Sequence, residues 1–212
     1  MDQLNAGLAT LKTRSKIAGA LILAYLVLEV ISLSIDGLTL TGALGTDDES
    51  VTAGIVGIAM LLNLLVFIAS SVIISMWIHR AHANLFAAHL DGLGYTPGWS
   101  VGWFFVPFAN LVKPFQAMRE LYNRSHGFDD GHSAPSPGEL TTWWGCYLTG
   151  SIAGNISFRL DNGSILAPPE GATMFAILSS VLLIVSAITL KRIIDSTTAA
   201  QSSMMGVSET FA

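Results

Sequence analysis

The stretch that decides the fold runs from Met76 to Ser125 and reads MWIHRAHANLFAAHLDGLGYTPGWSVGWFFVPFANLVKPFQAMRELYNRS. A long apolar segment ends at its start, and polar side chains appear there for the first time. An aromatic segment interrupted by prolines follows, and then a short basic segment with helical spacing. Outside this stretch the chain consists mainly of apolar runs and the links between them, so the sequence predicts a membrane protein.

The composition of the 212-residue chain agrees with a membrane location. Hydrophobic residues make up 51% of the sequence and charged residues only 12%, about half the charge of a soluble globular domain. The net charge of −5 argues against nucleic-acid binding, which requires clustered positive charge. The single cysteine, Cys146, excludes an intramolecular disulfide.

Four apolar segments have the length of a membrane span, and they are residues 17–35, 54–78, 140–158 and 172–190. A helix of about 19 residues rises about 28 Å, which is enough to cross a hydrocarbon core. In the third segment Cys146, Gly150 and Gly154 recur every four residues, and such small side chains let another helix approach closely. The predicted fold class is therefore all-α and polytopic, with four transmembrane helices.

The link between the second and third spans contains one more apolar segment, residues 95–112. As a helix, residues 97–112 would rise only about 24 Å, and Pro107 would remove a backbone hydrogen bond within it. We therefore expect a re-entrant or interfacial aromatic loop rather than a fifth span. A short amphipathic helix should follow and complete the interfacial unit 95–124.

The positions of the basic residues also favour four spans. With four spans, nine lysines and arginines lie on the inner side of the membrane, whereas a fifth span would divide the ten basic residues equally. The positive-inside rule then places both termini in the cytoplasm. Arg159 is the one basic residue outside, and the nine inside are Lys12, Arg14, Lys16, Arg80, Lys113, Arg119, Arg124, Lys191 and Arg192.

The two ends of the chain flank a predicted membrane domain of residues 17–192. In residues 1–16, Leu4, Leu8 and Leu11 have helical spacing and precede basic residues, which predicts an amphipathic helix on an anionic membrane surface or a solvated helix end. Residues 193–212 show no apolar period, and we expect them to form a disordered tail.

Several short motifs stand in and just after the central stretch. They are Trp77, Arg80 and Asn84; Pro97-Gly98-Trp99; Gly102-Trp103-Phe104; Val106-Pro107-Phe108-Ala109-Asn110-Leu111; Lys113-Pro114, Met118 and Glu120; and Trp143-Trp144. With these residues the chain resembles, from about 64 to 192, the bacterial membrane family catalogued as domain of unknown function 4328. The family has no established activity, cofactor or substrate, so the resemblance implies a multi-pass protein of the bacterial cytoplasmic membrane and no chemistry.

The candidate site residues form three groups. Arg80 and Asn84 share a helix face, and we expect them to hold the aromatic loop or to bind an anionic headgroup. The loop-clamp or ligand-binding group is Arg80, Asn84, Trp99, Trp103, Pro107, Asn110 and Glu120; the lipid-headgroup group is Lys113, Arg119 and Arg124; and the intramembrane polar group is Glu29, Asn63, Asn155 and Arg159.

Glu29 is the one acid well inside a predicted span. Intramembrane acids are costly and are usually paired or functional. Three interpretations stay open: a structural contact with Asn63 or Arg159, an ion or proton relay, and an acid that reaches the membrane surface. His79 and His82 are three residues apart and are candidates for a metal site, but no HExxH or CxxC motif accompanies them. We expect no metal and no cofactor.

The sequence leaves two functions open. The first is a non-enzymatic membrane module that presents a platform at the cytoplasmic leaflet to a protein partner or to anionic lipid, with a homo-oligomer also open. The second is a small transporter or ion-coupled permease subunit that uses Glu29. An intramembrane hydrolase has the least support, because Ser70, Ser71 and Ser75 lie in a span without a histidine to act as their base.

Overall fold

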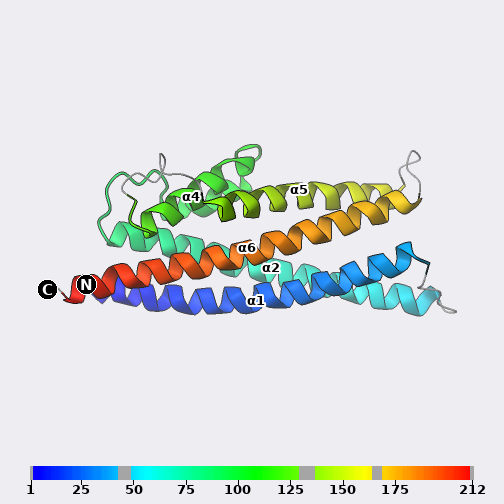
Figure 1. Ribbon diagram of the computed structural model, residues 1–212, viewed down its shortest axis with the longest axis horizontal. Helices are drawn as coiled ribbons and strands as arrows, with labels where there is room; N and C mark the ends of the chain where they lie inside the picture. Colours follow the sequence, from blue (N-terminus) through cyan, green and yellow to red (C-terminus); the bar gives the residue numbers. More distant parts are fainter. Residues whose placement is uncertain (1, 43–48, 129–136, 164–168, 211–212) are drawn as a thin grey trace. The chain divides into compact units, whose positions relative to one another are not determined.

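The computed structural model describes residues 2–42, 49–128, 137–163 and 169–210 (Figure 1). Within these residues every regular element is a helix, which confirms the predicted all-α class. The elements are α1 (Asp2–Leu40), α2 (Glu49–Ala87), α3 (Pro97–Gly102), η1 (Trp103–Phe105), η2 (Ala109–Leu111), α4 (Lys113–Ser125), α5 (Gly138–Asp161) and α6 (Pro169–Thr210).

Three helices in the described part of the chain are long and apolar enough to cross a membrane. The candidate spans are Gln3–Leu40 in α1, Val56–Ala87 in α2 and Gly171–Ser203 in α6. Only 6% of the most apolar part of α2 is buried inside the protein, so its aliphatic side chains face outward. Such a large exposed apolar surface indicates lipid as the surrounding solvent. The remaining predicted span, residues 140–158, lies in α5, which is less apolar than these three helices.

The chain divides into two compact units, which we describe separately. Unit 1 comprises Met1–Ala20, Ser70–Thr141 and Thr189–Ala212, and unit 2 comprises Leu21–Ala69 and Thr142–Ile188. This grouping differs from the predicted division into a membrane domain with two flanking segments. Both ends of the chain belong instead to one unit together with the central stretch.

Unit 2 contains one segment of each long helix, and its α5–α6 contact follows from small side chains. A Cβ atom at Gly150 would lie 3.1 Å from Leu183, and one at Gly154 would lie 2.9 Å from Ser179. The Ser179 hydroxyl donates to the carbonyl oxygen of Gly150 at 2.9 Å. The four-residue spacing of small residues thus brings α5 against α6, as the sequence predicts.

Unit 1 has a core in which the first turns of α1 take part. Leu11 is fully buried and Leu8 nearly so, and Nη1 of Arg14 donates to the carbonyl oxygen of Met76 in α2 at 2.5 Å. The predicted amphipathic segment 1–16 is therefore no separate helix on a membrane surface. It is the beginning of the continuous helix α1, and its leucines pack within the protein.

The expectation of a disordered tail after residue 192 is wrong for the described residues, because α6 continues to Thr210. Ile193, Ile194 and Thr197 are fully buried, and Gln201 is only 2% exposed. These positions recur every three to four residues, which is the spacing of one helix face. Two of the four side chains are polar, so the segment has no apolar period although it has a buried face.

Candidate functional site

The predicted aromatic loop is held at its start by Glu120 of α4. The Glu120 side chain is 1% exposed, and its two carboxylate oxygens accept hydrogen bonds from the backbone amides of Gly94, at 2.7 Å, and Tyr95, at 3.1 Å. The Tyr95 hydroxyl donates to Oε1 of Gln116 at 2.8 Å. Hydrogen bonds to an ionised acceptor are stronger than neutral ones. Glu120 is therefore the member of the predicted clamp group that does hold the loop.

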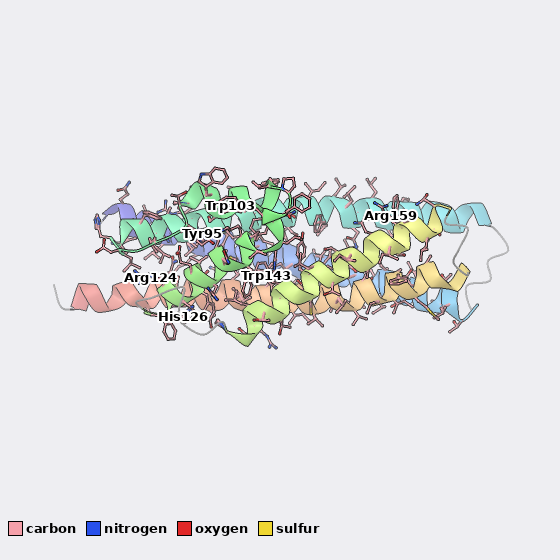
Figure 2. All side chains as sticks on the ribbon, turned by 90° about the horizontal axis from the view of Figure 1, so that it is seen from above. Tyr95, Trp103, Arg124, His126, Trp143 and Arg159 are labelled. Carbon is pink, nitrogen blue, oxygen red and sulfur yellow. The ribbon has the colours of Figure 1, made fainter. Side chains whose placement is uncertain are left out.

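The loop itself consists of the three short helices α3, η1 and η2. Thr96 caps α3 through a hydrogen bond from the backbone amide of Trp99 at 3.4 Å, and Pro97 occupies the first turn. The rings of Trp99 and Trp103 lie 4.9 Å apart, so the two tryptophans share a face as their spacing predicts. Nζ of Lys113 lies 5.9 Å from the ring centre of Trp103 and 6.0 Å from that of Tyr95 (Figure 2).

Pro107 and Asn110 form the turn between η1 and η2. The carbonyl oxygen of Pro107 accepts a hydrogen bond from the amide of Ala109 at 2.7 Å, and the amide of Asn110 donates to Val106 at 2.9 Å. Phe108, between them, has a φ of 62°, which is rare for a residue with a side chain. This backbone conformation occurs at the most exposed aromatic ring in the described part of the chain.

The loop presents an apolar surface, which we call the aromatic face. Phe105 is 79% exposed and Phe108 is 86% exposed, and Trp99, Leu111 and Val112 are about half exposed. A monomeric soluble protein rarely exposes large contiguous apolar patches. Glu120 holds the start of the loop, so these exposed apolar side chains lie on a segment that is anchored to α4.

Arg80 and Asn84 do not hold the aromatic loop, contrary to our expectation. Nε of Arg80 donates to Oδ1 of Asn84 at 2.9 Å, and Nδ2 of Asn84 donates to Oε1 of Gln201 in α6 at 3.1 Å. Gln201 in turn donates to the carbonyl oxygen of Ala81 and to Oγ of Ser125, both at 3.0 Å. The two residues share a helix face as expected, but Arg80 is bonded to Asn84 of the same helix and Asn84 to Gln201 of α6.

Arg124 is also not available to a lipid headgroup. Its side chain is buried, and its guanidinium group donates to the carbonyl oxygens of Asp91 at 2.5 Å and Phe128 at 3.3 Å. Lys113 and Arg119 are half-buried, and Nε of Arg119 has no hydrogen-bond partner. That Nε atom is buried, whereas Nζ of Lys113 lies over the rings of Tyr95 and Trp103.

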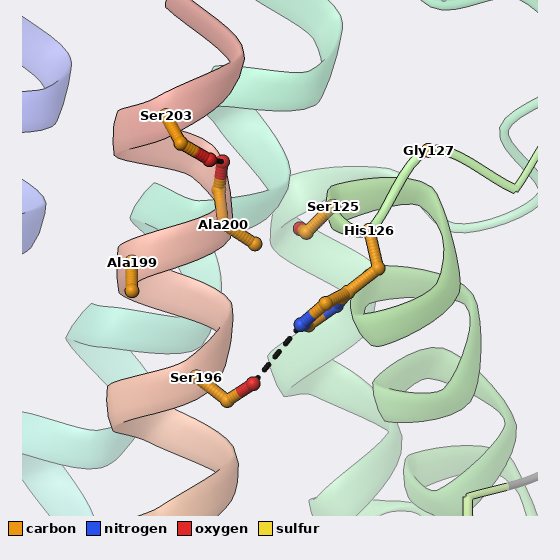
Figure 3. A pocket seen from close by; sticks show the side chains of 7 residues that line it. All are labelled: Ser125, His126, Gly127, Ser196, Ala199, Ala200 and Ser203. Atoms are coloured by element: carbon orange, nitrogen blue, oxygen red, sulfur yellow. Dashed lines mark hydrogen bonds between the residues drawn. The ribbon is translucent and has the colours of Figure 1, made fainter.

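A pocket of about 510 Å³ lies between α4 and the last turns of α6 (Figure 3). Nδ1 of His126 lies 2.7 Å from the carbonyl oxygen of Tyr122, so Nδ1 carries the proton and donates. Nε2 then accepts the hydroxyl proton of Ser196 at 3.0 Å. The lining residues are Ser125, His126, Gly127, Ser196, Ala199, Ala200 and Ser203.

The ring of His126 is exposed, and its contact with Ser196 joins α4 to α6. A serine next to a neutral imidazole is also the first step toward a nucleophile. A nucleophilic site needs, in addition, donors aimed at a developing oxyanion. The other hydroxyls of the pocket are engaged elsewhere, since Ser125 accepts from Gln201 and Ser203 donates to Ala200. The arrangement is that of a helix-to-helix contact.

Residues 41–199, more than half of the chain, match the family model of DUF4328, a domain of unknown function. The chain belongs to the DUF4328 family. The resemblance seen in the sequence extended from about residue 64 to residue 192, so the match is longer at both ends. It includes the link between α1 and α2 and the residues up to 199 of the predicted tail. No curated protein and no solved structure matches the chain.

In this DUF4328 protein the two candidate metal ligands lie in different surroundings. His79 is exposed, whereas His82 is buried, with Nδ1 3.0 Å from the carbonyl oxygen of Ile78. Within the described residues no group of three or more histidine, cysteine, aspartate or glutamate side chains could hold a metal ion. The pair therefore offers no complete coordination sphere.

The intramembrane polar group of the DUF4328 protein separates into a buried pair and two exposed residues. Glu29 is 7% exposed, and Nδ2 of Asn63 donates to its Oε1 at 3.1 Å. Asn155 and Arg159 are exposed on α5, with Arg159 near the end of that helix (Figure 2). Of the two partners expected for Glu29, the contact is with Asn63.

Proposed function

We propose that this DUF4328 protein is a non-enzymatic membrane module. In this proposal the chain crosses the membrane four times, and the aromatic loop is a platform on the cytoplasmic side whose aromatic face enters the inner leaflet and meets anionic lipid. The observation that carries this proposal is the near-complete exposure of Phe105 and Phe108 on a loop that Glu120 fixes from inside the protein.

The helix lengths in unit 2 support four spans. Its helical segments are residues 21–40, 49–69, 142–161 and 169–188, each of about 20 residues. A helix of that length rises about 30 Å, the thickness of a hydrocarbon core. The segment of α5 is less apolar than the others, but its glycines pack on α6, so α6 covers part of it.

The distribution of charge supports the orientation. Nine of the ten lysine and arginine residues lie in unit 1, and Arg159 is the one basic residue of unit 2. Basic residues concentrate on the cytoplasmic side of membrane proteins. Unit 1 and both chain termini are accordingly cytoplasmic in this proposal.

The chemistry of the aromatic face supports insertion into lipid. Moving one phenylalanine side chain from water into an apolar environment stabilises a protein by about 1.5–3 kcal/mol. Tryptophan and tyrosine prefer the boundary between lipid and water, and lysine and arginine there can reach phosphates. Phe105 and Phe108 would therefore lie deepest, with Lys113 and Arg119 at the level of the headgroups.

A spin label on a single cysteine tests the proposal directly. In a Cys146→Ser background, Phe105→Cys is labelled with a nitroxide, and the protein is reconstituted into vesicles that contain anionic lipid. We expect the label to collide more often with oxygen, which concentrates in the bilayer, than with a water-soluble nickel complex. Ser203→Cys, on an exposed turn of α6, is the matched control and should favour nickel. If the label at position 105 collides more often with nickel, as in this control, insertion is refuted. If it is shielded from both oxygen and nickel, the aromatic face is covered by a protein partner or a second copy.

Impermeant thiol reagents test the orientation in the same background. Cysteines in place of Leu40 and Asn162, at the far ends of α1 and α5, should react from outside the cell. Cysteines in place of Gly127 and Ser203 should react only after the membrane is opened. Labelling of Gly127→Cys from outside would contradict the four-span orientation.

A further inference from the structure

Glu29 is a buried carboxyl group that the platform function does not use. It lies near the middle of the 20-residue segment that α1 contributes to unit 2, and it is 7% exposed. The sequence of unit 2 contains no lysine or histidine and only one arginine, Arg159, which is exposed on α5. Within the described residues, no basic side chain forms a salt bridge with Glu29.

The partners of Glu29 are neutral. Nδ2 of Asn63 in α2 donates to Oε1 of Glu29 at 3.1 Å, and the phenol of Tyr25, one turn earlier in α1, lies close enough to the carboxyl group to interact with it electrostatically. The ring of Tyr25 packs 6.4 Å from that of Phe67, one turn after Asn63, which fixes the phenol between the two helices. Three oxygen-bearing side chains thus converge from two helices.

The side chains described around Glu29 add no positive charge. Asp36 lies two turns further along α1, and Tyr147 of α5 is close to Tyr25. Residues 171–188 of α6 contain no titratable side chain. A carboxylate in an apolar bundle is costly unless a positive charge compensates it. The compensating charge must therefore come from outside the protein.

We infer that Glu29, Asn63 and Tyr25 form a binding site for a monovalent cation within unit 2. One carboxylate neutralises one positive charge, and the amide and phenol oxygens are hard neutral donors of the kind that alkali cations accept. A divalent cation would keep an uncompensated charge, since the site has one acid, and an anion would be repelled. A proton and a sodium ion share this chemistry, and the experiment distinguishes them. The site lies in unit 2 and does not depend on lipid binding by the aromatic face.

A hydrophobic carbodiimide tests the site on the purified full-length protein in detergent. Such a reagent adds to a protonated carboxyl group in apolar surroundings, and an acyl shift then leaves a stable N-acylurea that mass spectrometry locates. We expect an adduct at Glu29. If the site binds protons, the adduct forms more slowly as the pH is raised, and sodium chloride has the same effect on that rate as choline chloride. If the site binds sodium, sodium slows the labelling at fixed pH by at least about tenfold relative to choline.

Two outcomes would overturn the inference. One is the absence of an adduct at Glu29 under every condition, and the other is labelling that neither pH nor sodium changes. Tyr25→Phe keeps the ring against Phe67 and removes the hydroxyl, so it should reduce the response to the cation several-fold in a folded protein. Asp36→Asn is the matched control on the same helix and should keep the response.

A second measurement does not depend on labelling. The melting temperature of the wild-type protein should shift with the concentration of the cation that the labelling identifies. Glu29→Gln, which retains an oxygen to accept from Asn63, should melt at a temperature that the cation does not change. If Glu29→Gln does not fold, Tyr25→Phe provides the same comparison. A variant that keeps the full cation-dependent shift would show that the cation binds elsewhere.

Discussion

Nδ2 of Asn84 donates a hydrogen bond to Oε1 of Gln201 at 3.1 Å, although the two residues are 117 positions apart in the chain. Both side chains are buried. Gln201 also uses its two amide protons, which bond to the carbonyl oxygen of Ala81 and the hydroxyl of Ser125. The Gln201 side chain therefore joins α6 to the C-terminal part of α2 and to the end of α4. The last turns of α6 are part of the structure that presents the aromatic face.

Replacing Gln201 should loosen unit 1. Gln201→Leu has a similar volume but leaves the amide of Asn84 buried without its acceptor, and an unsatisfied buried polar group costs about 1–3 kcal/mol. We expect a loss of that size in the free energy of unfolding, measured by denaturant titration in detergent. Ser203→Ala, on an exposed face two residues further along, is the control and should change it little. Equal effects of the two variants would mean that the hydrogen bonds of Gln201 contribute nothing.

Gly7 allows α1 to approach the side chains of Arg80 and Asn84 closely. A Cβ atom at Gly7 would collide with the ends of the Arg80 and Asn84 side chains, and Asn84 is held in place by Gln201. Gly7→Ala should therefore destabilise the protein by about 1–3 kcal/mol, the usual cost of overpacking. Gly37→Ala in the same helix meets no atom within 4 Å and should be neutral or stabilising by up to about 1 kcal/mol, because alanine favours helices. If Gly7→Ala is as stable as Gly37→Ala, the close approach of α1 has no energetic role.

Local spacing allowed part of this structure to be predicted. The sequence predicted a short helix at the end of the unit 95–124, and α4 lies there; the repeat of small residues predicted that Gly150 and Gly154 would meet another helix. The prediction that Arg80 and Asn84 share a helix face was also correct, since the two side chains are hydrogen-bonded to each other. Each of these inferences needs only residues within a few turns of each other, and helical geometry fixes their relation.

The partners of the polar side chains could not be predicted in the same way. Arg124 was expected to reach lipid, but it caps the carbonyl oxygens of Asp91 and Phe128, and no local pattern specifies such a contact. The buried face after residue 192 was missed because threonine and glutamine do not count as apolar. A signal was present in the three- and four-residue spacing of Ile194, Thr197 and Gln201, and it appears only when polar residues are allowed to be buried.

Glu120 should control the order of the aromatic loop. Glu120→Ala removes the acceptor for the backbone amides of Gly94 and Tyr95, so these amides should lose protection and the loop should open more often. Hydrogen bonds to charged groups contribute about 1.5–3 kcal/mol each. Hydrogen exchange followed by mass spectrometry should therefore show faster exchange from residue 94 to residue 105. Glu120→Gln keeps one acceptor oxygen and should give an intermediate rate, and unchanged exchange in Glu120→Ala would contradict the clamp.

Lys113 and Arg119 should determine the preference of the DUF4328 protein for anionic lipid. A basic residue near an anionic leaflet contributes about 1 kcal/mol, so losing both should weaken the preference for anionic over neutral lipid by about 30-fold. The variant Lys113→Gln with Arg119→Gln should therefore retain less anionic lipid in native mass spectrometry while its unfolding is nearly unchanged. Arg124→Gln provides the contrast, because that guanidinium group binds backbone carbonyls inside the protein. It should lower stability and leave the lipid preference intact. If Arg124→Gln instead abolishes lipid retention in a stable protein, the headgroup site includes Arg124 and the buried contacts assigned to it are not the ones that matter.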